Sequence, residues 1–309
     1  MRKLNIAIVG LGNIGSYLFK YLNDNKKFLT EKNNCLPVDK YVSAKSANKK
    51  RNIKIKKSQW IKDYLKITKL KDVDLIVELI GGAEGPAKKL VFNALQNGKH
   101  VVTANKALIA KYGDKLAKIA EANKVNLEFE ASVCGGVPII RSLKEGLIAN
   151  KISKIYGILN GTSNYILSSM DKQDENFETV LENAKKLGYA ESNPKADING
   201  DDVSSKLKIL SSLCFNSFLN NNIYVEGIKN IDKTDVVNAN TLGYKIKLLG
   251  FAELLNNKIY QRVHPTLIKK DSYVASIDGV LNAVIVDGDP VGQSTIQGEV
   301  QVLRQRLQL

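Results

Sequence analysis

Cysteine and long apolar runs are scarce in this sequence, and their scarcity excludes several classes of protein. Only three cysteines occur in 309 residues, widely spaced and without a CxxC pair, so neither a disulfide framework nor a zinc site is expected. No apolar run approaches the ~18 residues of a membrane-spanning helix. The N-terminal run is short and ends in glycines without a cleavage site, so we interpret it as a strand rather than a secretion signal. A reducing cytoplasm and no membrane partner are expected.

Acidic residues are outnumbered, with 31 Asp and Glu against 46 Lys and Arg and a formal net charge of +15. Such an excess can indicate nucleic-acid binding. Here it is mostly lysine, spread through predicted helices without a recognition motif or interleaved aromatic residues. A solvated, lysine-rich surface is therefore favoured, and no nucleic-acid partner is expected. The 44% hydrophobic and 25% charged residues are typical of a globular chain, long enough for two domains.

A glycine-rich turn follows the first predicted strand. The apolar run "LNIAIVG" (4–10) leads into "GLGNIG", which has GxGxxG spacing, and then into a helical pattern at 16–22. In this context the glycines permit a tight turn, the approach of a pyrophosphate and close packing of the helix, whose N-terminus attracts the anion. The alternative is a glycine turn without a ligand. The predicted coenzyme-binding residues of this turn are Gly10, Leu11, Gly12, Asn13, Ile14 and Gly15.

Strands and helices continue to alternate through the first half of the chain. Further strands are predicted at 40–44, 74–80, 100–104 and 126–133, with helices at 86–98 and 106–123. This alternation predicts an α/β fold with a Rossmann-type doubly wound parallel sheet over residues 1–134. From about residue 135 the pattern changes, and residues 135–299 predict a second α+β domain on a mixed sheet, used for substrate binding, catalysis and dimerisation. In this domain a strand is predicted at 275–286, and a helix starting near residue 161 is expected to be capped by Thr162 or Ser163.

The end of the second predicted strand bears on the choice of coenzyme. An acidic residue usually holds the ribose hydroxyls of NAD at this place. The sequence instead reads "AKSANKKR", with Lys45, Lys49, Lys50 and Arg51 and no carboxylate. Positive charge suits a 2′-phosphate, so NADP is favoured. The same lysines could equally be part of a lysine-rich surface, and NAD is kept as the alternative.

Carboxylates crowd together in one stretch of this basic chain, "GYAESNPKADINGDDVSSKLKIL" (188–210). Asp202 and Lys206 stand four residues apart on a predicted helix, so both project from one side. Val203, Leu207, Leu210 and Cys214 form an apolar stripe beside them that would anchor the helix in the core. On spacing alone, an exposed ion pair worth a few tenths of a kcal/mol is the alternative to a site.

Several motifs, taken in order, resemble the homoserine dehydrogenase family from residue 4 to about residue 298. They are "VELIGG" (77–82), "GKHVVTANKALIA" (98–110), "FEASVCGGVPII" (129–140), "GILNGTSNYIL" (157–167), the stretch from Gly188, and "VHPTLI" (263–268). The resemblance implies NAD(P)H-dependent, reversible reduction of L-aspartate 4-semialdehyde to L-homoserine, on the route to threonine, isoleucine and methionine. It also implies a homodimer.

The resemblance assigns roles to individual residues. It implies that Lys206 gives the proton to the carbonyl oxygen and that Lys106 is a second lysine near nicotinamide and substrate. Glu191 and Asp202 would hold the substrate ammonium, with Asp197 as a weaker third. Further coenzyme contacts are implied at Lys45, Thr103, Lys106 and Gly188. A sodium ion, as a possible cofactor, would be bound by the backbone carbonyls of Glu130, Val133, Gly135 and Val137.

The chain departs from the family after Glu299. The family continues with a Gly-Ala-Gly-rich turn and then Pro-Thr-x-Ser-Ala, whereas this sequence reads "VQVLRQRLQL" (300–309). Codons for Gly-Ala-Gly-Ala-Pro-Thr-Thr-Ser-Ala-Thr, read one base off, can encode all of these residues. We therefore expect a single-base frameshift, which sequencing of the locus would test. The altered tail leaves two alternatives to the enzyme: a nucleotide-binding protein with impaired catalysis, or another two-domain NADP oxidoreductase acting on a different aldehyde.

Overall fold

The computed structural model describes residues 1–216 and 223–299. The chain forms two compact units, one comprising residues 1–132 and the other beginning at residue 133. Each unit has its own sheet and its own buried core. The tail 300–309, where we expect the frameshift product, lies outside the described residues.

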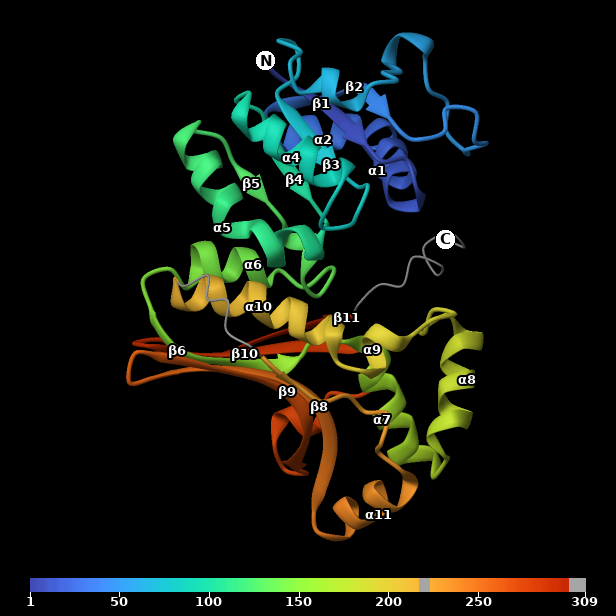
Figure 1. The fold of residues 1–309 in the computed structure, drawn as a ribbon, viewed down its shortest axis with the longest axis vertical. Helices are drawn as coiled ribbons and strands as arrows, with labels where there is room; N and C mark the ends of the chain where they lie inside the picture. The colour runs from blue at the N-terminus through green and yellow to red at the C-terminus, as the bar shows by residue number, and fades with distance from the viewer. Residues whose placement is uncertain (217–222, 300–309) are drawn as a thin grey trace. The chain divides into compact units, whose positions relative to one another are not determined.

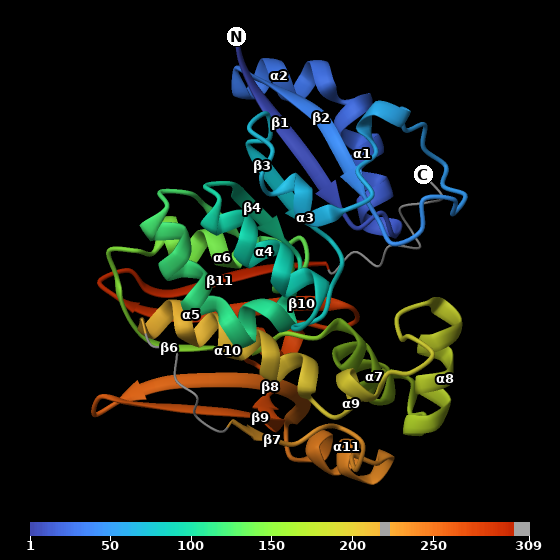
Figure 2. The same cartoon turned by 45° about the horizontal axis from the view of Figure 1, so that its top comes forward.

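The first unit is built on a five-stranded sheet with the order β2-β1-β3-β4-β5, in which every neighbouring pair is parallel. Figure 2 shows β1 and β2 side by side. The chain leaves β1 for β2 on one side and returns to β3 on the other, so the winding reverses beside β1. In doubly wound sheets, ligands bind at the carboxyl ends of the strands where this reversal occurs. The predicted doubly wound sheet is confirmed. Its strands are β1 (Arg2–Val9), β2 (Cys35–Ser43), β3 (Leu75–Glu78), β4 (His100–Thr103) and β5 (Leu127–Glu128).

Helices connect these strands. The prediction of a strand at 126–133 is wrong beyond Glu128. A 3-10 turn, Glu130–Ser132, takes its place. Helix α2 was not predicted, because it buries no residue and so shows no apolar periodicity. The helices are α1 (Asn13–Asp24), α2 (Lys26–Asn33), α3 (Tyr64–Ile67), α4 (Pro86–Gln96) and α5 (Lys106–Ala122), with a 3-10 turn at Lys57–Gln59.

The second unit contains a mixed sheet, as predicted, whose order over the described residues is β11-β10-β6-β8-β9-β7. Its pairs are antiparallel except for β7 with β9. The predicted strand at 275–286 begins later than expected, because a 3-10 turn (Tyr273–Ser276) precedes it. The strands are β6 (Lys151–Ile158), β7 (Tyr224–Val225), β8 (Tyr244–Leu255), β9 (Lys258–Lys269), β10 (Leu281–Asp289) and β11 (Gly292–Glu299).

Helix α10 (Asp201–Phe215) lies along one face of this sheet (Figure 1). Its stripe residues Val203 and Leu207 are fully buried. A side chain at Gly250 of β8 would meet both of them at 3.1 and 3.6 Å, so this glycine lets the helix pack closely. The other helices are α6 (Ile139–Arg141), followed by a π-helical turn (Ser142–Gly146), α7 (Gly161–Gln173), α8 (Phe177–Leu187), α9 (Lys195–Ile198) and α11 (Lys233–Thr241).

The N-cap of α7 differs from the expected one. Thr162 or Ser163 was expected to cap this helix, but its N-cap is Asn160, whose side chain accepts a hydrogen bond from the Ser163 N–H at 2.8 Å. Thr162 instead donates to the carbonyl oxygen of Tyr189. Asparagine satisfies a free helical N–H as well as serine or threonine does, so sequence alone could not rank these candidates.

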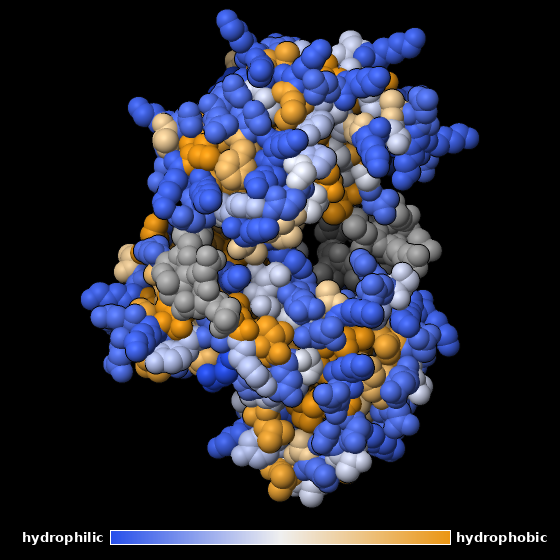
Figure 3. Space-filling model, in the orientation of Figure 1, coloured by the Kyte–Doolittle hydropathy of each residue, from blue (hydrophilic) through white to orange (hydrophobic). Residues whose placement is uncertain are grey.

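Hydrophilic side chains dominate the view in Figure 3, with hydrophobic residues scattered among them. Many lysines of the described residues are exposed, as the lysine-rich composition predicts. None of the helices in the described residues is long and apolar enough to cross a membrane.

Candidate active site

The glycine turn between β1 and α1 has the geometry that a pyrophosphate needs. Gly10 has φ +107°, and a side chain there would lie 2.4 Å from the Leu79 backbone. A side chain at Gly15 would lie 1.9 Å from the Gly10 carbonyl oxygen, so only glycine lets the helix approach the strand. At Gly12, by contrast, a side chain would meet no atom of the described residues within 4 Å. Gly12 is the N-cap of α1 and offers no side-chain acceptor, so the helix N-terminus faces open space suited to an anion.

A buried carboxylate orders the loops that follow β3 and β4. Glu78 is 0% exposed, and its Oε1 accepts from the N–H groups of Ile80 (2.7 Å) and Gly81 (2.9 Å). Its Oε2 accepts from the Thr103 hydroxyl at 2.6 Å. Thr103 in turn accepts from the Asn105 N–H at 2.9 Å. The sequence does not predict this role of Glu78, because nothing in it signals which distant groups the carboxylate will meet.

Lys106 begins α5 directly after this network. Asn105 caps the helix by accepting from the Leu108 N–H at 3.1 Å, and its amide donates to the Gly82 carbonyl at 2.8 Å. These bonds join the loop after β3 to the first turn of α5 and so fix the position of the Lys106 backbone. Lys106 is half-buried and interacts with other residues of the chain.

The loop after β2 is shaped by Arg51, which was expected to contribute charge for a 2′-phosphate. Its guanidinium donates instead to four backbone carbonyls, those of Leu11 (3.0 Å), Ser46 (2.8 Å), Ala47 (3.4 Å) and Lys49 (2.9 Å). The bond to Leu11 ties this loop to the glycine turn. The positive charge that remains exposed beside the turn is that of Lys45, Lys49 and Lys50.

Asp202 and Lys206 form an ion pair at the start of α10, with Lys206 Nζ 2.7 Å from Asp202 Oδ2. Each side chain is only 12% exposed, which removes the pair from the class of ordinary surface ion pairs. Lys206 Nζ also donates to the Leu159 carbonyl at 2.5 Å. Asn160 donates from one amide nitrogen to Asp202 Oδ2 (2.9 Å) and to Asp197 Oδ1 (2.7 Å). The ammonium and two of the three predicted carboxylates therefore lie in one cluster.

Glu191 and Gly188 lie on the connection between α8 and α9. Gly188 has φ +79° and is the C-cap of α8, a left-handed position that glycine favours. Glu191 is exposed, and within the described part of the chain it makes no hydrogen bond or ion pair. The structure thus assigns Gly188 a local backbone role, and its predicted coenzyme contact stays a prediction.

The turn predicted to bind sodium has left-handed backbone at Cys134 (φ +55°) and Gly135 (φ +58°). The Cys134 carbonyl accepts from the Val137 N–H at 3.1 Å. Glu130 belongs to the first unit, whereas Val133, Gly135 and Val137 belong to the second. In the described ranges, no three His, Cys, Asp or Glu side chains group in a way that could hold a metal ion. Sodium binding by carbonyls stays a prediction.

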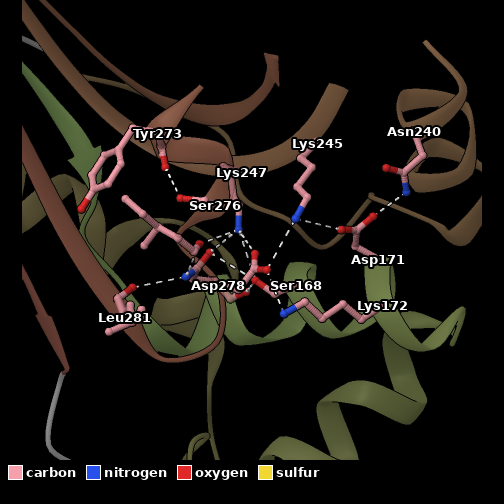
Figure 4. Close-up of polar contacts among 12 residues, drawn as sticks. Ser168, Asp171, Lys172, Asn240, Lys245, Lys247, Tyr273, Ser276, Asp278 and Leu281 are labelled. Carbon is pink, nitrogen blue, oxygen red and sulfur yellow. Dashed lines mark hydrogen bonds and ion pairs between the residues drawn. The ribbon is translucent and has the colours of Figure 1, made fainter. Parts of the chain in front are cut away.

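A second charged cluster, which the sequence did not signal, holds α7 to β8 (Figure 4). Lys247 is 1% exposed and donates to Asp278 Oδ1 at 2.8 Å and to the Ile277 carbonyl at 2.7 Å. Lys172 and Lys245 also reach Asp278, at 2.9 and 3.5 Å. Burial would raise the pKa of Asp278, but its hydrogen bonds to Lys247 and Lys172 outweigh burial and hold that pKa well below 3.8. Burial lowers the pKa of Lys247, and the bond to Asp278 offsets only part of that.

The fold and these sites define a class, a two-domain oxidoreductase with a dinucleotide-binding unit and a separate unit carrying a lysine–carboxylate cluster. Residues 10–130 match the family described as "Homoserine dehydrogenase, NAD binding domain", and residues 138–301 match "Homoserine dehydrogenase". The chain belongs to the homoserine dehydrogenase family of oxidoreductases.

Individual relatives agree with this assignment. A homoserine dehydrogenase from Neisseria gonorrhoeae is 44% identical over 302 residues, which cover 96% of this chain and 68% of the relative. The crystal structure of a homoserine dehydrogenase from Thiobacillus denitrificans superposes with a TM-score of 0.89 at 39% identity, covering 99% of this chain and 73% of that one. A hyperthermophilic archaeal mutant in complex with NADPH shares the fold, with a TM-score of 0.80 at 22% identity, covering 99% of this chain and 96% of that one.

Proposed function

We propose that this chain reduces L-aspartate 4-semialdehyde to L-homoserine with NADPH, reversibly, in the biosynthesis of threonine, isoleucine and methionine. The observation that carries the proposal is the largely buried Lys206–Asp202 pair, in a segment that matches the family. Hydride addition to an aldehyde builds negative charge on oxygen, and an ammonium group can stabilise that charge and give a proton.

Lys206 is suited to this role because of how its protons are used. An ammonium has three protons. Within the described residues, one N–H of Lys206 points to Asp202 and a second is hydrogen-bonded to the Leu159 carbonyl. The third N–H is left for the aldehyde oxygen. NADPH, when bound, would supply the hydride for the carbonyl carbon, and Lys206 would supply the proton that completes the alcohol. The neutral amine then regains a proton from solvent. Both anchors are acceptors, so they hold the nitrogen before and after the transfer.

Three carboxylates are proposed to recognise the substrate ammonium. Asp202 and Asp197 are joined through Asn160, and Glu191 is exposed on the neighbouring connection, where it can reach a ligand. We propose that Lys106, at the start of α5, contributes a second positive charge near the nicotinamide.

NADP is proposed as the preferred coenzyme. The loop directly after β2, residues 44–51, contains no carboxylate. Lys45, Lys49 and Lys50 are exposed on this loop, which Arg51 ties to the glycine turn. A ribose 2′-phosphate would find positive charge here, whereas NAD would lack its usual carboxylate partner. NAD remains the alternative.

An assay of NADPH absorbance with aspartate semialdehyde tests the proposal. We expect turnover by the purified chain and a loss of about 10²–10⁴-fold in kcat for Lys206→Ala, the usual contribution of a general acid. Lys208→Ala, on the same helix, is the matched control and should keep full activity. Tight NADPH binding without turnover would favour the impaired nucleotide-binding protein. Turnover of a different aldehyde alone would favour another oxidoreductase.

The proposed homodimer and sodium ion rest on the family resemblance. Light scattering on the purified chain tests the first. Replacement of sodium by a large organic cation, with kcat and the melting temperature as readouts, tests the second. A monomer at assay concentration, or unchanged values without sodium, would remove the respective proposal.

A further inference from the structure

Two consecutive residues, Leu159 and Asn160, contact both members of the proposed catalytic pair. They join β6 to α7. The Leu159 carbonyl accepts from Lys206 Nζ at 2.5 Å, and the Asn160 side chain donates to Asp202 Oδ2 at 2.9 Å. The same Asn160 nitrogen donates to Asp197 at 2.7 Å. A single turn of backbone therefore fixes one ammonium and two carboxylates.

Every hydrogen-bonding group of the Asn160 side chain is engaged. Its two N–H donors serve the two carboxylates, and its oxygen accepts from the Ser163 N–H. Ionised carboxylates only accept and a backbone N–H only donates, so the amide has one orientation that satisfies all three. The side chain is 5% exposed, and water does not compete strongly for these bonds.

The surrounding structure holds this turn in place. Asn282, which is fully buried, donates to the Leu159 carbonyl at 3.3 Å. One turn along α7, Asn164 donates to the carbonyls of Ile277 (3.1 Å) and Leu281 (3.2 Å). Lys247, labelled in Figure 4, donates to Asn164 Oδ1 at 3.1 Å. The start of α7 is thus fixed to β8 and β10.

We propose that Asn160 is a positioning residue for the reaction. It keeps two like charges, Asp197 and Asp202, close together by donating a hydrogen bond to each. It also holds Asp202 where that carboxylate meets Lys206, so that the remaining proton of the lysine points at the aldehyde. This inference rests on the proposed function and adds a residue that recognises neither substrate nor coenzyme itself.

Two substitutions separate positioning from helix capping. Asn160→Asp keeps an acceptor for the Ser163 N–H but replaces both donors with a negative charge. Asn160→Ser keeps a capping oxygen and replaces both amide N–H donors with a single hydroxyl on a shorter side chain, without adding charge. We expect kcat to fall about 10- to 100-fold in both, as expected for misplaced reacting groups. In Asn160→Asp, the added charge favours protonated Lys206, so the alkaline limb of the pH profile of kcat should move to higher pH.

Asp232→Ser is the matched control, because Asp232 caps α11 by accepting from the Asp235 N–H and lies in no proposed site. It should leave kcat and its pH profile unchanged. If both Asn160 variants also keep the wild-type kcat and pH profile while Lys206→Ala abolishes turnover, the inference is wrong and the proposed function stands. If the wild-type chain itself shows no turnover, the proposed function fails, and this inference fails with it.

Discussion

Gly12 and Gly15 of the coenzyme turn have different physical roles. Replacing each with alanine should therefore have different effects on folding and on NADPH binding. Gly12→Ala places its methyl group in open space where we expect the pyrophosphate, so folding should change by no more than about 1 kcal/mol. The Kd for NADPH should rise at least 10-fold. Gly15→Ala places its methyl group against the Gly10 carbonyl and should destabilise the chain by about 1–3 kcal/mol.

Fluorescence titration with NADPH and urea unfolding of both variants check this contrast. Equal loss of stability in the two variants would show that the open space at Gly12 is occupied by the protein itself.

Residues whose geometry is set by local spacing could be predicted from the sequence. The tight turn at the glycines of "GLGNIG" and the pairing of Asp202 with Lys206 are of this kind, because neighbours in the chain determine them, while their roles in binding and catalysis stay predictions. Glu78, Asn160 and Lys247 could not be predicted. Their side-chain partners Thr103, Asp197 and Asn164 lie 25, 37 and 83 residues away along the chain, and only the folded structure brings them together.

Elements with a one-sided apolar pattern were predictable, and those without it were not. α10 has a buried stripe and was predicted. α2, "KKFLTEKN", buries nothing, and its helical form could not be told from a polar loop. The end of β5 was missed because "FEAS" alternates like a strand although its backbone turns after Glu128.

The joint between α7, β8 and the segment before β10 predicts an acid-sensitive stability. The pKa of Asp278 is lowered by Lys247 and Lys172, so its ion pairs contribute fully above about pH 4 and lose strength as pH falls through the lowered pKa. Asp278→Asn should cost about 3–5 kcal/mol at neutral pH, because it leaves Lys247 buried without its counter-charge. The difference between wild type and variant should shrink toward pH 2.

Urea unfolding at pH 7, 4 and 2 measures this difference. Glu182→Gln, which removes the carboxylate of an exposed pair with Lys185, is the control and should show little effect at neutral pH. A constant difference between wild type and Asp278→Asn at all three pH values would contradict the assignment of the acid sensitivity to Asp278.

At the scale of the whole molecule, the division into two units with separate cores predicts which residues coenzyme binding will protect from hydrogen exchange. A ligand stabilises the state it binds, by about 2.7 kcal/mol at 100 times its Kd. Hydrogen exchange with NADPH should therefore slow most in residues 10–16, 43–51 and 79–82 of the first unit. NADH at the same concentration should protect residues 43–51 less, because it has no 2′-phosphate for the lysines. Protection confined to the second unit would contradict the assigned coenzyme site.

The division into a parallel-sheet half and a mixed-sheet half was predictable, because alternating strands and helices give way to a different pattern near residue 135. The strand order of the second sheet was not predictable from the sequence. It places β6 between β10 and β8, which are far from it in the sequence, and no local signal encodes such pairings.

Lys206 and Asp202 share one helix, whereas Glu191 stands on an exposed connection outside it. The proposed proton donor and this exposed carboxylate can therefore be altered separately. A mutant library confined to residues 189–194 would sample new aldehydes for a biocatalyst while leaving Lys206 and Asp202 unchanged.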